Sequence, residues 1–199
     1  MAKKVLIILD PGHGNNTPGK RSPVWADGRQ LFEHEFNWDV VERIKNKLVL
    51  IHEDIHITRG NNVVDVPLSE RVSVANSIAK NYDASVFVSV HANAGGGTGW
   101  EVFTSVGQTT SDKYATIFYE EMQKEFPNMK FRKDTSDGDV DKESQFYVLK
   151  NTHMPAVLTE NFFMDTLTPD CELIMSNQGR EKIAEAHIRA IVKILNLIK

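Results

Sequence analysis

The sequence predicts a single-domain α/β protein with a twisted, mostly parallel sheet and helices on both faces, of the phosphorylase/hydrolase-like kind. Residues 5–9 and 86–90 are continuous apolar runs rich in β-branched side chains, which is typical of strands buried on both faces. Segments with a helical spacing of apolar residues separate the predicted strands, and this alternation favours parallel pairing. The length of 199 residues fits one domain, and we find no linker to a second one.

The N-terminal half predicts three strands and two helices. The strand at 5–9 ends at Asp10, Pro11 and Gly12, and a loop rich in Gly, Pro, Asn and Ser continues to residue 27. Apolar residues recur every three or four positions in residues 37–51, which predicts a helix. A short strand is predicted at 55–58. The second helix, at 68–80, follows a proline start signal and precedes the strand at 86–90.

The C-terminal half begins with a glycine-rich loop at 94–99 and a predicted strand at 100–104. Ser111 is the expected N-cap of the next helix. The polar residues 127–144 predict an exposed loop, and its aspartates Asp134, Asp137, Asp139 and Asp141 lack the EF-hand spacing, so we expect a solvated segment. Short strands are predicted at 146–149 and 156–158, and an amphipathic helix at 180–197.

Composition excludes several classes of function. The formal net charge of -4 gives no basic surface for nucleic acid or for anionic membranes. The single cysteine, Cys171, excludes an internal disulfide and a cysteine-based zinc site, and we expect a structural thiol. The first apolar run is too short for a signal peptide, and no stretch is long enough to cross a bilayer. We therefore expect a protein made in the cytoplasm without a signal peptide.

Two histidines and two carboxylates stand at the ends of predicted elements. His13, His91 and Glu160 each follow or end a predicted strand, and the carboxyl ends of parallel strands meet at one edge of a sheet. Glu33 precedes Asn37 by four residues, near the start of the first helix, where it can reach that edge. Two histidines, one carboxylate ligand and a further carboxylate are the inventory of a hydrolytic zinc site.

Five segments together resemble a known family. In chain order they are LDPGHG at residues 9–14, Glu33-x-x-x-Asn37, LSERVxxAN at 68–76, SVHAN at 89–93 and PAVLTE at 155–160. In order and rough spacing they resemble the zinc-dependent N-acetylmuramoyl-L-alanine amidases of the amidase-3 type, over residues 5–194. The resemblance implies a Zn²⁺ ion held by His13, Glu33 and His91, and a catalytic Glu160. It also implies cleavage of the amide between the lactyl group of N-acetylmuramic acid and the L-alanine of the stem peptide.

The zinc site would leave one of four tetrahedral positions open for water or substrate. Glu160 is expected to take a proton from the attacking water and pass it to the leaving nitrogen. Asp10 or a backbone carbonyl is expected to bind the free nitrogen of an imidazole ligand.

Some residue roles stay open at this point. The family often has Glu-Lys before the helix, whereas this chain has Glu33-His34-Glu35, so Glu35 competes with Glu33 as the ligand; the spacing to Asn37 favours Glu33. The chain also has Asn15 where the family has a glycine.

Several other polar and aromatic residues also have two interpretations. Asn93 binds substrate or caps the glycine-rich turn, and Arg71 contacts substrate or has a structural role. Trp25 and Trp100 stack on substrate or pack in the core. His52, His56 and His187 are interpreted as surface or helix-face residues.

Two other functions compete with the amidase. A zinc peptidase acting on short peptides could use the same ligands, with Arg71 as the only candidate for binding a terminal carboxylate. A catalytically inactive wall-binding module would be expected to lack one of the four site residues, and all four are present. The resemblance favours a monomeric catalytic domain without a cell-wall-binding domain, which acts on peptidoglycan or muropeptides, after release as a phage endolysin or inside a bacterium as a recycling enzyme.

Overall fold

The computed structural model describes residues 3–60 and 64–198 and contains a six-stranded sheet in the order β2-β1-β3-β6-β4-β5. The strands are β1 (Val5–Pro11), β2 (Ile55–Ile57), β3 (Ala84–Asn93), β4 (Glu101–Thr104), β5 (Lys142–Glu143) and β6 (Ala156–Phe163). β2, β1, β3 and β6 pair in parallel, whereas β4 runs antiparallel to β6 and β5 follows the direction of β4. The prediction of a mostly parallel sheet is confirmed.

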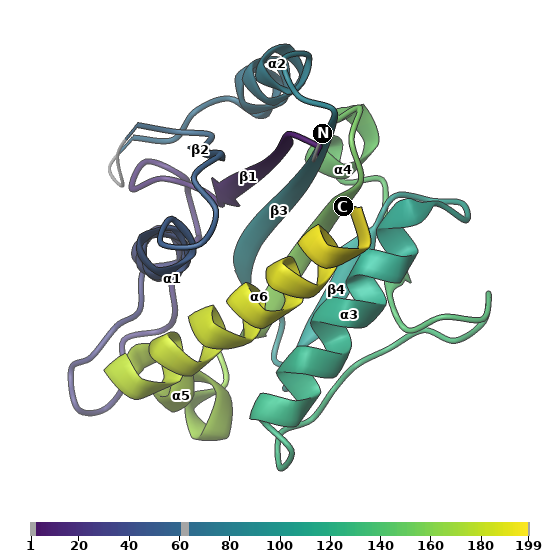
Figure 1. Cartoon of the computed structure of the whole chain (residues 1–199). Helices are drawn as coiled ribbons and strands as arrows, with labels where there is room; N and C mark the ends of the chain where they lie inside the picture. The colour runs from purple at the N-terminus through teal and green to yellow at the C-terminus, as the bar shows by residue number, and fades with distance from the viewer. Residues whose placement is uncertain (1–2, 61–63, 199) are drawn as a thin grey trace.

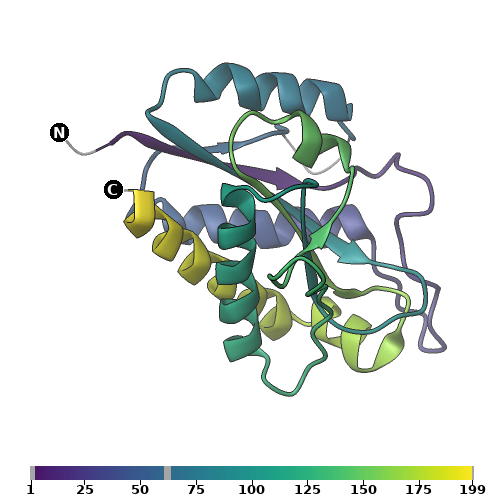
Figure 2. The ribbon, with the colours of Figure 1, turned by 90° about the vertical axis from the view of Figure 1, so that its right-hand side faces the viewer.

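Helices cover both faces of the sheet (Figure 1). They are α1 (Glu33–Leu48), α2 (Leu68–Ala79), α3 (Thr110–Glu125), α4 (Tyr147–Asn151), α5 (Glu172–Met175) and α6 (Asn177–Ile198), with an irregular helical turn η1 (Leu167–Cys171) before α5. α1, α3 and α6 lie together on one face, and α2 and α4 lie on the other (Figure 2).

The two central strands explain the two helical layers. Alternate residues of β1 enter different cores: Ile7 and Leu9 lie in the core beneath α1, α3 and α6, and Leu6 and Ile8 lie in the core beneath α2 and α4. All four side chains are at most 1% exposed. A strand that is buried on both faces needs apolar residues at every position, and this is the continuous run that the sequence shows.

Two predicted elements differ in the structure. Residues 146–149 were predicted as a strand, but they begin the helix α4, whose Val148 and Leu149 pack in the α2 side of the core. A run of four apolar residues carries too little periodicity to distinguish the two conformations, and packing against α2 decides. The N-cap of α3 is Thr109, which forms a capping box with Asp112, whereas the predicted cap, Ser111, accepts a hydrogen bond from the Ala156 N–H at 3.1 Å.

The helix α1 starts four residues earlier than predicted and ends at Leu48. Its first turn contains Glu33 and His34, both buried. The earlier start places Glu33 in the first turn of the helix, where the free N–H groups and the helix dipole favour a carboxylate.

Of the two interpretations of His187, surface or helix-face residue, the structure excludes the surface, because the side chain lies on the buried face of α6 and is 0% exposed. Its Nε2 lies 3.0 Å from the Thr159 hydroxyl and its Nδ1 lies 2.8 Å from the Ile183 carbonyl. Burial lowers the pKa of His187 to about 4. The helical spacing in the sequence places His187 on the apolar face of α6, but the spacing does not reveal that the imidazole has hydrogen-bond partners in the core.

His187 should therefore make the protein less stable in mild acid. Between pH 6.5 and pH 4 the unfolded imidazole binds a proton and the folded one does not, so stability present above pH 6.5 is lost as the pH falls. The expected loss between pH 6.5 and 5 is roughly 1–2 kcal/mol.

We expect His187→Leu to flatten the pH dependence of the free energy of unfolding, measured by urea titration at pH 5 and pH 7. The exposed His153→Leu is the control and should keep the slope of the native protein. Equal slopes for His187→Leu and the native protein would contradict the assignment.

Candidate metal centre and catalytic cleft

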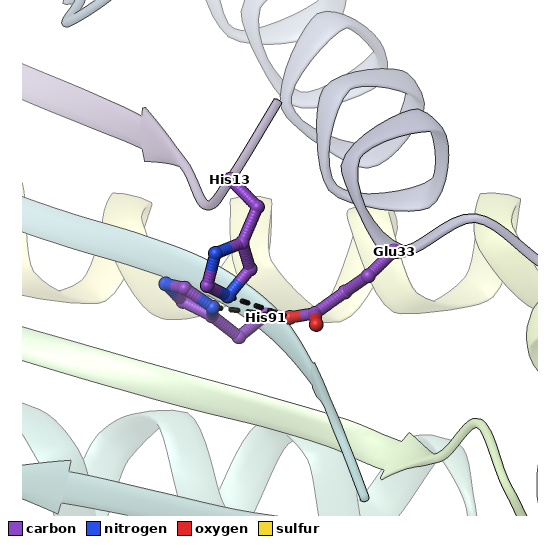
Figure 3. A group of neighbouring side chains, drawn as sticks. All are labelled: His13, Glu33 and His91. Carbon is purple, nitrogen blue, oxygen red and sulfur yellow. Dashed lines mark hydrogen bonds and ion pairs between the residues drawn. The ribbon is translucent and has the colours of Figure 1, made fainter. Parts of the chain in front are cut away.

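Three side chains from three elements converge at the carboxyl edge of the sheet (Figure 3). His13 follows β1, Glu33 lies in the first turn of α1, and His91 lies near the end of β3. Glu33 Oε1 is 3.4 Å from His13 Nε2 and 3.2 Å from His91 Nδ1, and one potential ligand atom from each residue lies within 4.8 Å of the others. The structure thus brings together the three residues that the sequence selected as metal ligands.

The turn after β1 is shaped around the His91 ring. A Cβ atom added at Gly12 would lie 2.1 Å from His91 Cε1, so only glycine allows the ring to occupy this position. The Gly12 N–H donates to the Val90 carbonyl at 3.0 Å, and the Gly12 carbonyl accepts from Asn37 Nδ2 at 3.0 Å. His13 itself has a positive φ of 60°, a conformation that is uncommon for a residue with a side chain. The turn is therefore held from both sides while it directs His13 toward Glu33.

The backbone of His91 is fixed by the neighbouring strand. Asn161 on β6 donates from Nδ2 to the His91 carbonyl at 3.0 Å, and its Oδ1 accepts from Trp100 Nε1 at 2.9 Å. Trp100 is 0% exposed, so of the two interpretations of this residue the structure shows the core residue. Trp25 is partly buried against the same core.

Glu33 offers a free oxygen atom to a cation. Its side chain is 1% exposed, and Oε2 accepts no hydrogen bond from any described residue, although the Lys20 ammonium lies 3.8 Å away. A buried carboxylate oxygen without a donor is costly unless a cation or a proton joins it. Glu35 points away from the histidines into solvent, so the geometry places Glu33 in the cluster.

The titration of His13 and Glu33 suits metal binding, whereas His91 differs: burial alone would lower its pKa, but the hydrogen bond and charge of Glu33 and the charge of Glu160 raise it above its ordinary value. Burial lowers the pKa of His13 to about 4, against the attraction of Glu33, so the ring is neutral at pH 7 with a lone pair available. Burial alone would raise the pKa of Glu33, but the hydrogen bond and charge of His91, with the charge of His13, lower it below its ordinary value. Two imidazoles and an ionised carboxylate are the donor set of zinc enzymes, so the residues present fit this ion.

Glu160 lies beside this cluster. It is the register partner of His91 on β6, and its Oε2 is buried without a hydrogen-bond donor among the described residues. Burial raises the pKa of Glu160 to about 8; the charge of His91 opposes this and the charge of Glu33 adds to it. A carboxyl group that titrates near neutral pH is suited to general acid–base catalysis.

Glu33 lies behind His13 and His91, which together with Glu160 line one cleft of about 200 Å³. Its other wall is apolar and comes from α2 and α4, including Leu68, Tyr147 and Val148. Residues 146–149, which the sequence predicts as a strand, therefore line the cleft as part of the helix α4.

Asp10 has a different role from the one predicted. Its Oδ1 accepts hydrogen bonds from Thr58 Oγ1 at 2.5 Å and Arg71 Nη1 at 2.8 Å, and its Oδ2 accepts from Ser89 Oγ at 2.7 Å. These bonds hold β1, β2 and β3 together beneath the site, and among the described residues Asp10 makes no hydrogen bond to an imidazole ligand.

Arg71 supports the same turn from below. Its side chain is 1% exposed, and it donates to Asp10, to the Pro11 carbonyl at 2.7 Å and to Asp65 at 2.5 Å. The guanidinium group is thereby saturated by the protein, which favours the structural interpretation; contact with substrate stays a prediction.

Both polar atoms of the Asn93 side chain form hydrogen bonds within the protein. Its Oδ1 accepts from the Ala94 N–H at 2.8 Å, and its Nδ2 donates to Glu101 at 2.5 Å. The first bond is the turn cap that the sequence suggested, and a contact with substrate stays a prediction.

Sequence reasoning missed the partners that hold the site. Glu101 is the register partner of Glu160 on β4 and accepts hydrogen bonds from Arg132 Nε at 2.8 Å and Lys142 Nζ at 2.5 Å. Asn161, to which the sequence assigned no role in the chemistry, is a further partner. Their positions depend on strand register, for which the sequence carries no signal.

Comparisons with known proteins identify the family of this chain. Residues 7–193 match the model of the family described as N-acetylmuramoyl-L-alanine amidase. The N-acetylmuramoyl-L-alanine amidase CwlM of Bacillus licheniformis is 33% identical over 198 residues, which cover 98% of this chain and 70% of that protein. The endolysin of Bacillus phage SPP1 is 34% identical over 199 residues, which cover 98% of this chain and 67% of the endolysin.

Solved structures show the same fold. An N-acetylmuramoyl-L-alanine amidase from Clostridium difficile 630 superimposes with a TM-score of 0.79 over 98% of both chains, at 24% identity. The catalytic domain of CwlV from Bacillus (Paenibacillus) polymyxa superimposes with a TM-score of 0.76, at 23% identity, over 97% of this chain and 98% of that domain. With the family match over most of its length, the chain belongs to the amidase-3 family of N-acetylmuramoyl-L-alanine amidases.

Proposed function

We propose that the protein is a zinc-dependent amidase that hydrolyses the bond between the lactyl group of N-acetylmuramic acid and the L-alanine of the peptidoglycan stem peptide. The observation that carries the proposal is the convergence of His13, Glu33 and His91 at the cleft that both histidines line together with Glu160, whose Oε2 has no hydrogen-bond partner among the described residues. Family membership supports the choice of bond.

In this proposal His13, Glu33 and His91 hold the ion. Zinc supplies Lewis acidity, polarising the amide carbonyl and lowering the pKa of a water molecule to about 7. Glu33 neutralises part of the charge, and its position in the first turn of α1 fixes the site against the sheet. Gly12 and Asn161 both position His91, Gly12 through close packing against the imidazole and Asn161 through the His91 carbonyl.

Glu160 moves the proton. Its carboxylate accepts a proton from the attacking water, and its carboxyl group returns that proton to the nitrogen of L-alanine as the amide bond breaks. Both forms are accessible near neutral pH because burial raises the pKa of Glu160 to about 8. The apolar wall formed by α2 and α4 excludes water from one side of the cleft, which strengthens electrostatic interactions inside it.

We further propose that the protein acts as a monomer on cell-wall peptidoglycan or on muropeptides, in the manner of a phage lysin or a bacterial autolysin. The similarity to an endolysin of a Bacillus phage and to an amidase of Bacillus licheniformis supports both settings. Within residues 3–60 and 64–198, no helix is both long and apolar enough to cross a membrane.

The structure disfavours Arg71 as the group that would bind the terminal carboxylate of a peptide in a carboxypeptidase, because Arg71 is buried and already paired with Asp10 and Asp65. Lys20 is a more accessible cationic side chain that lines the cleft. An inactive wall-binding module is also disfavoured, since the four site residues are present and adjacent.

Replacement of the carboxylate ligand should release the metal. We expect about one zinc per chain in the native protein, measured by atomic spectrometry after dialysis. Glu33→Gln should fall well below this value, because an amide is a poorer and uncharged ligand. The exposed Glu35→Gln is a matched control two residues away and should retain the metal. The reverse pattern would make Glu35 the ligand.

Replacement of Glu160 should abolish catalysis without releasing zinc. Mass spectrometry of digested peptidoglycan should detect free stem peptides that begin with L-alanine for the native protein. Glu160→Gln should reduce their rate of release by about 10²–10⁴-fold, the usual contribution of a general acid–base group. Cleavage at another peptide bond would contradict the amidase assignment, and undiminished release by Glu160→Gln would remove this residue from the mechanism.

A single methyl group at Gly12 should disturb the metal site. The added Cβ would displace the His91 ring, so we expect Gly12→Ala to weaken zinc binding by about 10–100-fold, the effect usual for lost ligand orientation. Competition with a fluorescent chelator measures this change. Gly60→Ala is the control, because a Cβ at Gly60 meets nothing within 4 Å. Equal affinities in both variants would show that the ring can move without loss.

A further inference from the structure

The cleft contains an accessible ammonium group, that of Lys20. In the described part of the chain, the lysine and arginine side chains that line the cleft are those of Lys20 and Arg71. The Arg71 guanidinium group is 1% exposed and is already bound by Asp10, Asp65 and two backbone carbonyls. The Lys20 side chain is 40% exposed, so it can meet a ligand that enters the cleft.

The protein leaves the donors of this ammonium group unused. Among the described residues Lys20 forms an ion pair with Glu33, whose Oε2 lies 3.8 Å from the Lys20 Nζ, too far for a hydrogen bond. No described residue accepts a hydrogen bond from this Nζ. An ammonium group carries three donors, so it has room for an anionic ligand. Glu33 is also a proposed metal ligand, and a bound cation would compete with Lys20 for its charge.

The backbone of Lys20 is fixed beside the first turn of α1. Its carbonyl accepts a hydrogen bond from the Glu33 N–H at 3.0 Å, and the next residue, Arg21, forms a β-bridge with Phe32. The four-carbon side chain is flexible, but the point from which it extends is held in place. The ammonium group therefore stays beside the metal ligands and can move a short distance along the cleft.

The substrate of the proposed function offers a matching anion. The stem peptide continues from L-alanine to D-glutamate, which is linked through its γ-carboxyl group, so its α-carboxyl group is either free or amidated. Two residues of extended chain span about 7 Å, so this group lies within reach of a flexible side chain that starts beside the scissile amide. Leu68, Tyr147 and Val148 on the other wall of the cleft carry no charge that could bind it.

We propose that Lys20 is a specificity-determining residue that binds the free α-carboxylate of the second residue of the stem peptide. The inference rests on the proposed amidase function, from which it takes the substrate. The protein then prefers stem peptides that carry this carboxylate to those in which it is amidated. Lys20 contacts the part of the substrate that leaves with the nitrogen, and the proton transfer remains with Glu160.

Two ligands that differ only in this group test the proposal. The first is N-acetylmuramoyl-L-alanyl-D-glutamic acid with the γ-carboxyl group capped as a methylamide, and the second has the α-carboxyl group converted to a carboxamide. Their dissociation constants are measured by calorimetry on metal-loaded Glu160→Gln, in which turnover is slow. We expect the acid to bind about 5–10-fold more tightly than the amide, as is usual for a hydrogen-bonded ion pair at a partly exposed site.

Variants of Lys20 separate charge recognition from a structural role. In the Glu160→Gln background, Lys20→Met keeps the length of the side chain but should bind the acid and the amide about equally, whereas Lys20→Arg should restore most of the preference. Lys45→Met removes the same charge from an exposed position in the last turn of α1 and should keep the full preference. A merely structural role of Lys20 would weaken the binding of both ligands alike and leave their ratio unchanged.

Turnover by the protein with Glu160 intact distinguishes this inference from the proposed function. Release of peptides that begin with L-alanine, together with equal dissociation constants for the acid and the amide, would retain the amidase and overturn the role of Lys20. A preference for the acid that Lys20→Met abolishes, together with cleavage at another bond, would support the carboxylate site and overturn the amidase. Absence of binding by the acid, or a preference that survives Lys20→Met, would also overturn the proposal.

Discussion

The parallel register of β1, β3 and β6 is the constraint on which the rest of the site depends. Asp10 pairs with Ser89, Pro11 with Val90, and His91 with Glu160, so the three strands end at nearly the same level. Because side chains alternate along a strand, a slip of one residue would turn His91 or Glu160 to the opposite face. The apolar residues of β1 and β3, buried on both faces, make such a slip very costly.

A buried polar network beside these strands fixes the turn that follows β1. Asp10 binds Thr58, Ser89 and Arg71, and Arg71 also holds the Pro11 carbonyl, one residue before Gly12. Such a network is stable when all its members are satisfied and costly when one is removed. The network gives the buried Arg71 its role beside the site: its donors fix the backbone that presents His13.

Two pairs of buried carboxylates, Glu33 with Glu160 and Asp139 with Asp141, differ in what surrounds them. Glu33 and Glu160 face two histidines, and the mixed nitrogen and oxygen donors fit zinc. Asp139 and Asp141 face each other, with the Thr104 hydroxyl and the Gln108 amide nitrogen as donors, and burial raises the pKa of Asp141 to about 7. The two pairs lie on opposite flanks of β4, where Lys142 next to Asp141 contacts Glu101, the register partner of Glu160.

The sequence by itself determined the fold class, the order of most elements and the four residues of the site. Buried strands need continuous apolar runs, and the polar residues that end them must gather at one edge, so His13, His91 and Glu160 could be placed without coordinates. The choice between Glu33 and Glu35 depended on the residue at which α1 begins, because the start at Glu33 buries Glu33 and exposes Glu35. The conformation of residues 146–149, the burial of His187 and the pairing of Asp139 with Asp141 were decided by tertiary structure alone. The physical reason is that each depends on neighbours distant in the chain, whose packing supplies or withholds partners that local spacing does not encode.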